Sequence, residues 1–289
     1  MKSDTIPISV VFLTYNDEQL IEDGLKSVAG WVSEIFVVDS NSTDNTLSIV
    51  QKYTDKIVVH AFENYAAQRN WAQDNLPISS EWLFHLDSDE RVTYELQNFL
   101  KTFFSKSVLP EIDGIIMPRR TVFMGRWIRY GGHYPVYHLR LFRRERGRCE
   151  DRLYDQHFTV PGQVVRASGD LVDVISTSLE SWTLRHVRWA GLEAQQQLEG
   201  HNPSTGVREN LNGTPIERRR WAKSRMFNRA PLFGRAFAYF LYRYVLRLGF
   251  LDGTPGLIFH VLQGFWFRFY IDARIWELRH QSDQKQHKR

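Results

Sequence analysis

The chain has 289 residues, of which 43% are hydrophobic and 14% aromatic, so it can fold around a substantial core and is not a disordered protein. Its net charge is +4 at pH 7, but residues 1–110 contain 8 Lys/Arg and 16 Asp/Glu, whereas the remainder contains 29 and 17. The acidic front half argues against a protein that simply coats nucleic acid, and the basic remainder requires an anionic partner or surface.

The first hundred residues alternate between two hydrophobic patterns. Short apolar runs predict four strands, at residues 8–13, 34–38, 56–60 and 82–86. Between them, apolar residues at helical spacing predict helices at residues 17–28, 47–53 and 64–75. This order predicts an α/β fold, in which helices cover both faces of a mostly parallel sheet and ligands bind beyond the carboxyl ends of the strands.

Polar clusters follow three of these strands. Asp87-Ser-Asp89 places two carboxylates one residue apart at a strand end, a plausible seat for a divalent cation that carries a phosphorylated ligand. A polar turn is the alternative. Asp39 can accept a hydrogen bond from a base or a ribose hydroxyl, because a carboxylate is a strong acceptor. Ser42 and Asp44 either contribute to the same site or cap the next helix.

From residue 111 the pattern changes. Residues 113–118 predict another strand, and residues 119–142, rich in Arg, Gly, Tyr and Trp, predict loops and short strands over an active site. Residues 184–198 predict a helix, and the Asn-, Gly- and Pro-rich residues 200–215 predict a linker.

The C-terminal quarter is basic and amphipathic. Residues 218–247 contain nine Lys/Arg and no Asp or Glu, with apolar residues at helical spacing, and residues 257–271 form a second apolar segment. Neither segment reaches the ~20 uninterrupted apolar residues that a spanning helix needs. Together they predict a helix pair that lies on anionic lipid. The alternative is that both helices pack on the core and expose a basic face to solvent.

Two features bear on location. The N-terminus lacks the basic and then apolar pattern of a secretory signal. The single cysteine, Cys149, excludes an internal disulfide framework and a cysteine-rich metal site, and suits a reducing compartment. We therefore expect a cytoplasmic protein, peripheral on the inner face of the cell membrane.

Four motifs in chain order resemble those of the family 2 glycosyltransferases of GT-A fold. They are Thr14-Tyr-Asn-Asp17, Val37-Val-Asp-Ser-Asn-Ser-Thr-Asp44, Asn64-Tyr-Ala-Ala-Gln-Arg-Asn70 and Leu86-Asp-Ser-Asp-Glu90. With residues 131–135, 139–143 and 249–253, the chain is most similar to the branch that includes lipopolysaccharide-core and exopolysaccharide transferases. The resemblance implies a Rossmann-like nucleotide-sugar-binding catalytic domain at residues 1–200 and a helical, membrane-associating region at residues 216–289.

The resemblance also implies an inverting, metal-dependent enzyme that moves a sugar from a nucleotide-sugar donor to a lipid-linked or lipopolysaccharide-type acceptor. A cation, Mn²⁺ or Mg²⁺, would stabilise the departing diphosphate. Asp89 would bind this cation, and Asp87 would lie near both the ribose and the cation. The other residues that it places at the nucleotide are Thr14, Asn16, Asp17, Asp39, Gln68 and Arg69. Many relatives have Glu where this chain has Asp17.

Inversion requires a base that deprotonates the acceptor hydroxyl. We predict Asp155, with Glu150 or Asp151 as the second choice. Several relatives have a His-Glu pair near this position, which the sequence does not reproduce, and His157 is more typical of a structural histidine. The expected partners are the nucleotide sugar, a glycan or glycolipid acceptor and an anionic membrane surface, without nucleic acid.

Two other functions are consistent with parts of the sequence. A nucleotidyltransferase also binds a nucleotide over a parallel sheet, but it would be expected to have a glycine-rich phosphate loop, and residues 14–18 contain no glycine. A non-catalytic protein could bind nucleic acid through residues 218–247, and its binding would be strongly salt-sensitive.

Overall fold

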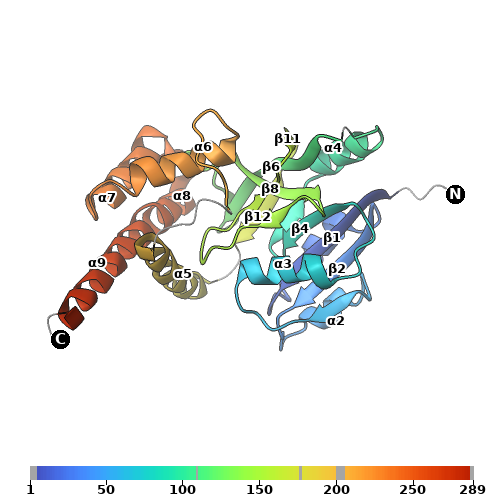
Figure 1. Cartoon of the computed structure of the whole chain (residues 1–289), viewed down its shortest axis with the longest axis horizontal. Helices are drawn as coiled ribbons and strands as arrows, with labels where there is room; N and C mark the ends of the chain where they lie inside the picture. The colour runs from blue at the N-terminus through green and yellow to red at the C-terminus, as the bar shows by residue number, and fades with distance from the viewer. Residues whose placement is uncertain (1–4, 109, 176–177, 200–205, 287–289) are drawn as a thin grey trace. The chain divides into compact units, whose positions relative to one another are not determined.

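The computed structural model describes residues 5–108, 110–175, 178–199 and 206–286. The chain forms two compact units (Figure 1). The first comprises residues 1–121, 136–151 and 156–175, and the second comprises residues 122–135, 152–155 and 176–289.

The first unit contains the main sheet and a separate two-stranded sheet. The strands of the main sheet in this unit are β1 (Ile6–Thr14), β2 (Val32–Asp39), β3 (Ile57–Val59), β4 (Trp82–Asp87), β5 (Glu90–Val92), β6 (Ile112–Phe123), β8 (Val136–Arg143), β11 (Gln163–Arg166) and β12 (Leu171–Ile175), and those of the small sheet are β9 (Arg148–Cys149) and β10 (Phe158–Thr159). Helices lie beside these strands in the first unit. Its helices are α1 (Ile21–Val28), α2 (Thr46–Val50), α3 (Tyr65–Asn75) and α4 (Tyr94–Phe104). The end of β6, from Val122, belongs to the second unit.

The four N-terminal strands of the sheet are parallel, in the order β3-β2-β1-β4. The sheet continues through β8, β6, β12 and β5, where the pairs β4–β8, β8–β6 and β12–β5 are antiparallel and β11 runs parallel beside β6. The predicted α/β fold class and all five predicted strands are confirmed.

The core forms around β1 because this strand is covered on both faces. Its residues Ile8, Val10 and Phe12 are fully buried against apolar residues of α1 and α4. A parallel strand in the middle of a sheet is expected to be apolar almost throughout, as residues 8–13 are. At the start of α3, the Asn64 side chain accepts a hydrogen bond from the Ala67 amide at 2.8 Å, which fixes the predicted beginning of this helix.

One prediction about the second half of the sheet is wrong. Residues 119–142 do not form loops and short strands throughout, since β6 continues to Phe123 and β8 is a regular strand between β4 and β6. Leu139 and Leu141 of β8 are buried, and so is Arg140, which lies in ion pairs. A buried charged residue between two apolar ones hides the strand pattern from a reading of hydrophobicity alone.

The second unit is mainly helical. Its elements are β7 (Arg126–Trp127), α5 (Leu179–Glu199), α6 (Pro215–Ala222), α7 (Gly234–Leu241), α8 (Gly253–Phe259) and α9 (Phe267–Gln286), together with the π-helical turns η1 (Lys223–Phe227), η2 (Tyr242–Leu246) and η4 (His260–Trp266) and the 3₁₀ turn η3 (Gly249–Asp252). α5 lies along α9 (Figure 1), because Ala190 and Ala194 admit the buried side chains of Phe267 and Ile271.

This packing places α5 with the C-terminal helices, whereas the sequence assigned residues 1–200 to the catalytic domain. The difference has a physical reason. The small residues of α5 allow it to pack closely against α9, which is about 80 residues away in the chain, and the local period of hydrophobic residues does not show which helices pack together. Residues 200–205 of the predicted linker lie outside the described residues, and residues 206–214 precede α6 without a helix or strand.

Two glycine-containing segments that the sequence singled out meet inside the second unit. The carboxylate of Asp252 accepts hydrogen bonds from the amides of Arg129 and Tyr130, and the amide of Gly131 donates to Arg247 O at 2.9 Å. The buried ring of His260 lies against both Gly131 and Gly249. Residues 131–135 and 249–253 therefore form one structural joint.

No single helix in the described ranges is long and apolar enough to cross a bilayer. By length and composition, only the pair formed by Gly234–Leu246 and Gly249–Gln281 meets that requirement together, and it is bent by 69°.

Candidate functional site

The carboxyl ends of the parallel strands place the predicted nucleotide residues side by side. Thr14 at the end of β1 lies opposite Asp39 at the end of β2, and the neighbouring Leu13 lies opposite Asp87 at the end of β4. The ends of three strands thus form one row, the position at which open α/β sheets bind their ligands.

The loop after β1 is fixed by the Asp17 carboxylate. Its Oδ2 accepts hydrogen bonds from Thr14 Oγ1 at 3.2 Å, from the Tyr15 amide at 3.1 Å and from Ser88 Oγ at 2.5 Å. Asn16, which has a positive φ of 52°, is exposed and accepts from the Thr43 amide at 2.7 Å. The predicted residues of this loop are therefore tied directly to the loops after β2 and β4.

Asp39 is fully buried. Its Oδ2 accepts from the Ser42 amide at 2.8 Å, while its Oδ1 has no hydrogen-bond donor among the described residues. A buried acceptor of this kind is costly unless a donor reaches it, as a ligand N–H or O–H could. Ser42 accepts from the Asn16 amide at 2.8 Å, and Asp44 accepts from the amides of Glu18 and Thr46. These two residues order the loop rather than act as a simple cap.

Gln68 and Arg69 are neighbours on α3, but their side chains contact different parts of the site. Gln68 is buried and bonded to His60 Nδ1 at 2.7 Å, to His60 O at 3.1 Å and to Ser40 Oγ at 3.2 Å, so it joins the loops after β2 and β3. Its direct contact with a donor stays a prediction. Arg69 donates to both oxygens of Asp87, at 2.9 and 3.0 Å.

Asp87 is held by a second guanidinium. Arg140 of β8 donates to Asp87 Oδ2 at 2.6 Å and to Glu90 Oε1 at 2.7 Å. Burial acts to raise the pKa of Asp87, but the charges of Arg140 and Arg69 outweigh it and hold that pKa below its usual range. Arg143, on the same strand, pairs with Glu81, which precedes the first residue of β4 and so lies far from the carboxyl end of that strand.

The side chain of Asp89 differs from that of Asp87 in its electrostatic surroundings. Within the described residues, its carboxylate has no hydrogen bond or ion pair, and burial together with the carboxylates of Asp173 and Asp87 raises its pKa well above the usual value. Asp173 of β12, which lies opposite Glu90 of β5, was not identified from the sequence, because only sheet pairing brings it to this site.

These residues fit a divalent cation without enclosing one. Carboxylate oxygens are the ligands that Mg²⁺ and Mn²⁺ prefer, and Asp89 offers both of its oxygens. The described part of the chain contains no group of three or more His, Cys, Asp or Glu side chains arranged to hold a metal by themselves. A cation at Asp89 would therefore need ligands from water or from the diphosphate of a nucleotide, as is usual for Mg²⁺.

Two of the three candidate bases lie in the first unit. Glu150 is buried, and its Oε1 accepts from the His157 amide at 2.9 Å and lies 3.4 Å from His157 Nδ1. Asp151 is exposed. The structure thus creates a His-Glu pair that the sequence does not show, because residues 150 and 157 are seven positions apart and meet only through the pairing of β9 with β10.

Asp155, the predicted base, belongs to the second unit. It has a positive φ of 59°, and its Oδ2 lies 2.9 Å from Lys223 Nζ. The structure therefore assigns Asp155 to the helical unit, whereas the row of strand ends belongs to the first unit, and the role of Asp155 stays a prediction.

Residues 9–162, more than half of the chain, match the model of glycosyl transferase family 2. The chain belongs to glycosyltransferase family 2. This assignment agrees with the positions of the four motifs, three at strand ends and one at the start of α3, and it establishes the protein as a glycosyltransferase.

Among relatives of this family 2 protein, the lipopolysaccharide core biosynthesis glycosyltransferase LpsC of Rhizobium meliloti is 29% identical over 201 residues, covering 67% of this chain and 73% of LpsC. An uncharacterized glycosyltransferase of Rickettsia conorii, RC0292, is 33% identical over 104 residues, and the match covers only 36% of each chain. The mannosyltransferase PcManGT from Pyrobaculum calidifontis, solved in complex with GDP-Man and Mn²⁺, superposes with a TM-score of 0.49 at 15% identity and covers 94% of this chain and 87% of its own.

Proposed function

We propose that this family 2 glycosyltransferase is an inverting, metal-dependent enzyme that adds a sugar from a nucleotide-sugar donor to a lipid-linked or lipopolysaccharide-type acceptor. The observation that carries the proposal is the row of strand ends at which Thr14, Asp39 and Asp87 meet, with the unpartnered carboxylate of Asp89 beside them. The similarity to LpsC supports the class of acceptor.

In this proposal each acidic residue has a separate part. Asp39 accepts a hydrogen bond from the nucleoside with its free Oδ1, and Asp87, oriented by two arginines, faces the ribose. Asp89 would hold Mn²⁺ or Mg²⁺, and such a cation would neutralise charge on the departing diphosphate. A base then removes the proton from the acceptor hydroxyl as it attacks the anomeric carbon, for which Asp155 is our first choice.

The direct test is turnover of a panel of nucleotide sugars with a lipopolysaccharide-core or lipid-linked acceptor and Mn²⁺ or Mg²⁺. We expect Asp89→Asn to lower kcat/KM by about a hundredfold or more, because the cation stabilises the transition state by several kcal/mol. The matched control is Asp55→Asn, which removes an exposed carboxylate from a turn of the same unit. Full activity of Asp89→Asn, or of the wild type after chelation, would exclude the cation assignment.

The same assay identifies the base. Replacing it should lower kcat by about 10²–10⁴-fold with little change in the KM for the donor, which is the usual contribution of general base catalysis. We compare Asp155→Asn, Asp151→Asn and Glu150→Gln. An unchanged kcat for Asp155→Asn would indicate that the base is one of the two candidates in the first unit.

We further propose that the second unit associates with an anionic membrane surface at the cytoplasmic face. Between α7 and η4 it exposes ten large apolar side chains: Phe237, Leu241, Tyr242, Val245, Leu246, Leu248, Phe250, Leu251, Leu257 and Val261. A surface of this size is not explained by core packing, and exposed Arg247 lies within it. By contrast, Arg220, Arg235 and Arg243 of the basic segment are buried, which weakens the nucleic-acid hypothesis.

Co-sedimentation with vesicles of phosphatidylglycerol and phosphatidylcholine tests this surface. Leu246→Asp and Phe250→Asp should each reduce the bound fraction severalfold, because a charge must enter the lipid interface. Leu211→Asp is the control, since Leu211 is also more than half exposed but lies before α6. Equal binding of all three variants, or preferential salt-sensitive binding to RNA or DNA, would contradict the membrane proposal.

A further inference from the structure

Helix α3 holds the hairpin of β9 and β10 through a side chain that bonds to its backbone. Asn70 Nδ2 donates to Cys149 O at 3.1 Å, and the Cys149 amide donates to Asn70 Oδ1 at 3.1 Å. Cys149 is buried, so its backbone groups need partners within the protein. One carboxamide satisfies both of them, as a neighbouring strand would, because Asn carries a donor and an acceptor side by side.

The next turn of α3 holds the loop that leads into the hairpin. Gln73 is buried, and its Nε2 donates to Arg144 O at 2.6 Å and to Gly147 O at 2.8 Å. These bonds fix the approach to β9, whereas the bonds of Asn70 fix its last residue. Asn70 is therefore the contact of α3 that lies closest in the chain to Glu150.

The same helix holds the end of β4. Arg69, which precedes Asn70, donates to both oxygens of Asp87, and its guanidinium lies 5.5 Å from the centre of the Phe158 ring of β10. This ring also stacks on the buried ring of His85 in β4, with centroids 4.7 Å apart. The hairpin thus contacts both α3 and β4, and all of these residues belong to the first unit. Two consecutive residues of α3 connect the hairpin to Asp87.

We infer that Asn70 is a positioning residue for sugar transfer, which fixes the start of the segment after β9 relative to Asp87. That segment carries the three candidate bases, Glu150, Asp151 and Asp155. Displacement of a reacting group by about 1 Å can cost roughly a hundredfold in rate. A loosened hairpin should therefore slow the chemical step and leave donor binding intact. The inference rests on the proposed function, which requires a base in this segment.

Steady-state kinetics of Asn70→Ala separate this role from a general loss of structure. With the nucleotide sugar that the wild type uses, we expect kcat to fall about 10–100-fold and the donor KM to change less than about twofold. Asn75→Ala is the matched control and should keep the wild-type kcat, because Asn75 is exposed on the same helix and donates to Trp71 O within it. Asn70→Asp keeps the acceptor for the Cys149 amide, so it supplies the same comparison if Asn70→Ala does not fold.

Cys149 reports on the hairpin without turnover, because it is the single cysteine of the chain. It is buried, and burial raises the pKa of its thiol, so the wild type should react slowly with N-ethylmaleimide. Asn70→Ala should raise the labelling rate about tenfold, the effect of losing about one net hydrogen bond that opposes local opening. Asn75→Ala should label at the wild-type rate.

Three results would overturn the inference. One is a kcat for Asn70→Ala that falls no further than that for Asn75→Ala. Another is a donor KM that rises as steeply as kcat falls, which would place Asn70 in contact with the nucleotide. The third is a Cys149 labelling rate that Asn70→Ala leaves unchanged. A wild type that transfers no sugar would reject the proposed function, and the labelling rates would show separately whether Asn70 holds the hairpin.

Discussion

At the scale of single residues, the site separates two aspartates that are equivalent in the sequence. Asp87 is ionised and immobilised by Arg69 and Arg140, whereas Asp89 lies among other carboxylates and has no cationic partner among the described residues. An anion already held by two guanidinium groups is a weak ligand for a cation, because its lone pairs are engaged. Asp89 is therefore the better candidate for a metal ligand, and the place of Asp87 on the ribose side of the site stays a prediction.

Replacing Arg140 tests this division. Arg140→Gln should lower the free energy of unfolding by about 3 kcal/mol, because it leaves the buried carboxylates of Asp87 and Glu90 without their shared counter-charge. Urea denaturation measures the change. Arg148→Gln, which breaks a half-exposed pair with Asp74, should cost less than about 1 kcal/mol. Equal losses for the two variants would show that Arg140 is not needed to hold the carboxylates.

At the scale of elements, the second unit depends on the joint between residues 131–135 and 249–253. Gly131 has a positive φ of 67°, and a methyl group on it would collide with the ring of His260. His260 in turn is enclosed by Gly249, so that ring position is fixed from two sides. The glycines are required both by backbone conformation and by the close approach of the histidine ring.

This joint predicts a difference between two glycine variants. Gly131→Ala should destabilise the chain by about 2–4 kcal/mol, the sum of backbone strain and overpacking. Gly125 also has a positive φ, of 74°, but open space surrounds the position of a new methyl group. Gly125→Ala should therefore destabilise the chain by only about 1 kcal/mol. Thermal unfolding of both variants measures the gap. A loss of stability for Gly131→Ala no greater than that for Gly125→Ala would show that the His260 ring can move aside without strain.

At the scale of the whole molecule, we expect the two units to respond to acid at different pH. In the second unit, burial lowers the pKa of His186 to about 4 and that of His260 to about 3. In the first, burial opposes ionisation of Glu34, but hydrogen bonds from Lys56, Ser9 and Ser79 lower its pKa to about 2. All three groups bind protons more readily when unfolded, so each stabilises its unit at high pH and loses that effect as the pH falls.

The pH windows follow from these values. The stabilisation from the two histidines is lost as the pH falls from about 6.5 toward about 4 for His186 and about 3 for His260. The stabilisation from Glu34 is lost between about pH 4.5 and 2. We therefore expect amide hydrogen exchange to show loss of protection first in α5 and η4 and later in β1 and β2. His186→Gln should flatten the first phase, and His280→Gln, an exposed position, should not. Simultaneous loss of protection in both units would contradict this order.

Much of the first unit could be predicted from the sequence. Strands at residues 8–13 and 82–86 are buried on both faces and therefore apolar almost throughout, and the helix that begins at Asn64 has a capping side chain, so local pattern was sufficient. Once these elements alternate, the parallel sheet follows, and with it the meeting of Thr14, Asp39 and Asp87 at one edge.

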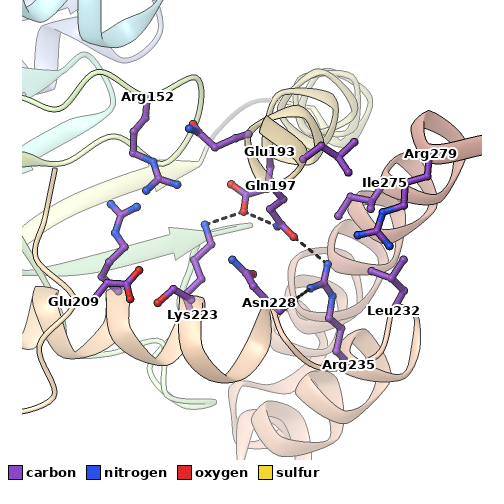
Figure 2. A pocket seen from close by; sticks show the side chains of 14 residues that line it. Arg152, Glu193, Gln197, Glu209, Lys223, Asn228, Leu232, Arg235, Ile275 and Arg279 are labelled. Carbon is purple, nitrogen blue, oxygen red and sulfur yellow. Dashed lines mark hydrogen bonds and ion pairs between the residues drawn. The ribbon is translucent and has the colours of Figure 1, made fainter. Parts of the chain in front are cut away.

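Other features were decided only by the tertiary structure. β8 enters the sheet between β4 and β6 because ion pairs allow Arg140 to be buried, and Glu150 meets His157 through the pairing of β9 with β10. A cavity of about 210 Å³ in the second unit (Figure 2) is lined by residues that are distant in the sequence, from Arg152 to Arg279. The sequence by itself determined the family, the strands and the row of strand-end residues, since these depend on local period and chain order. Charge neutralisation and packing between distant segments decided the rest, because both depend on which side chains meet in space.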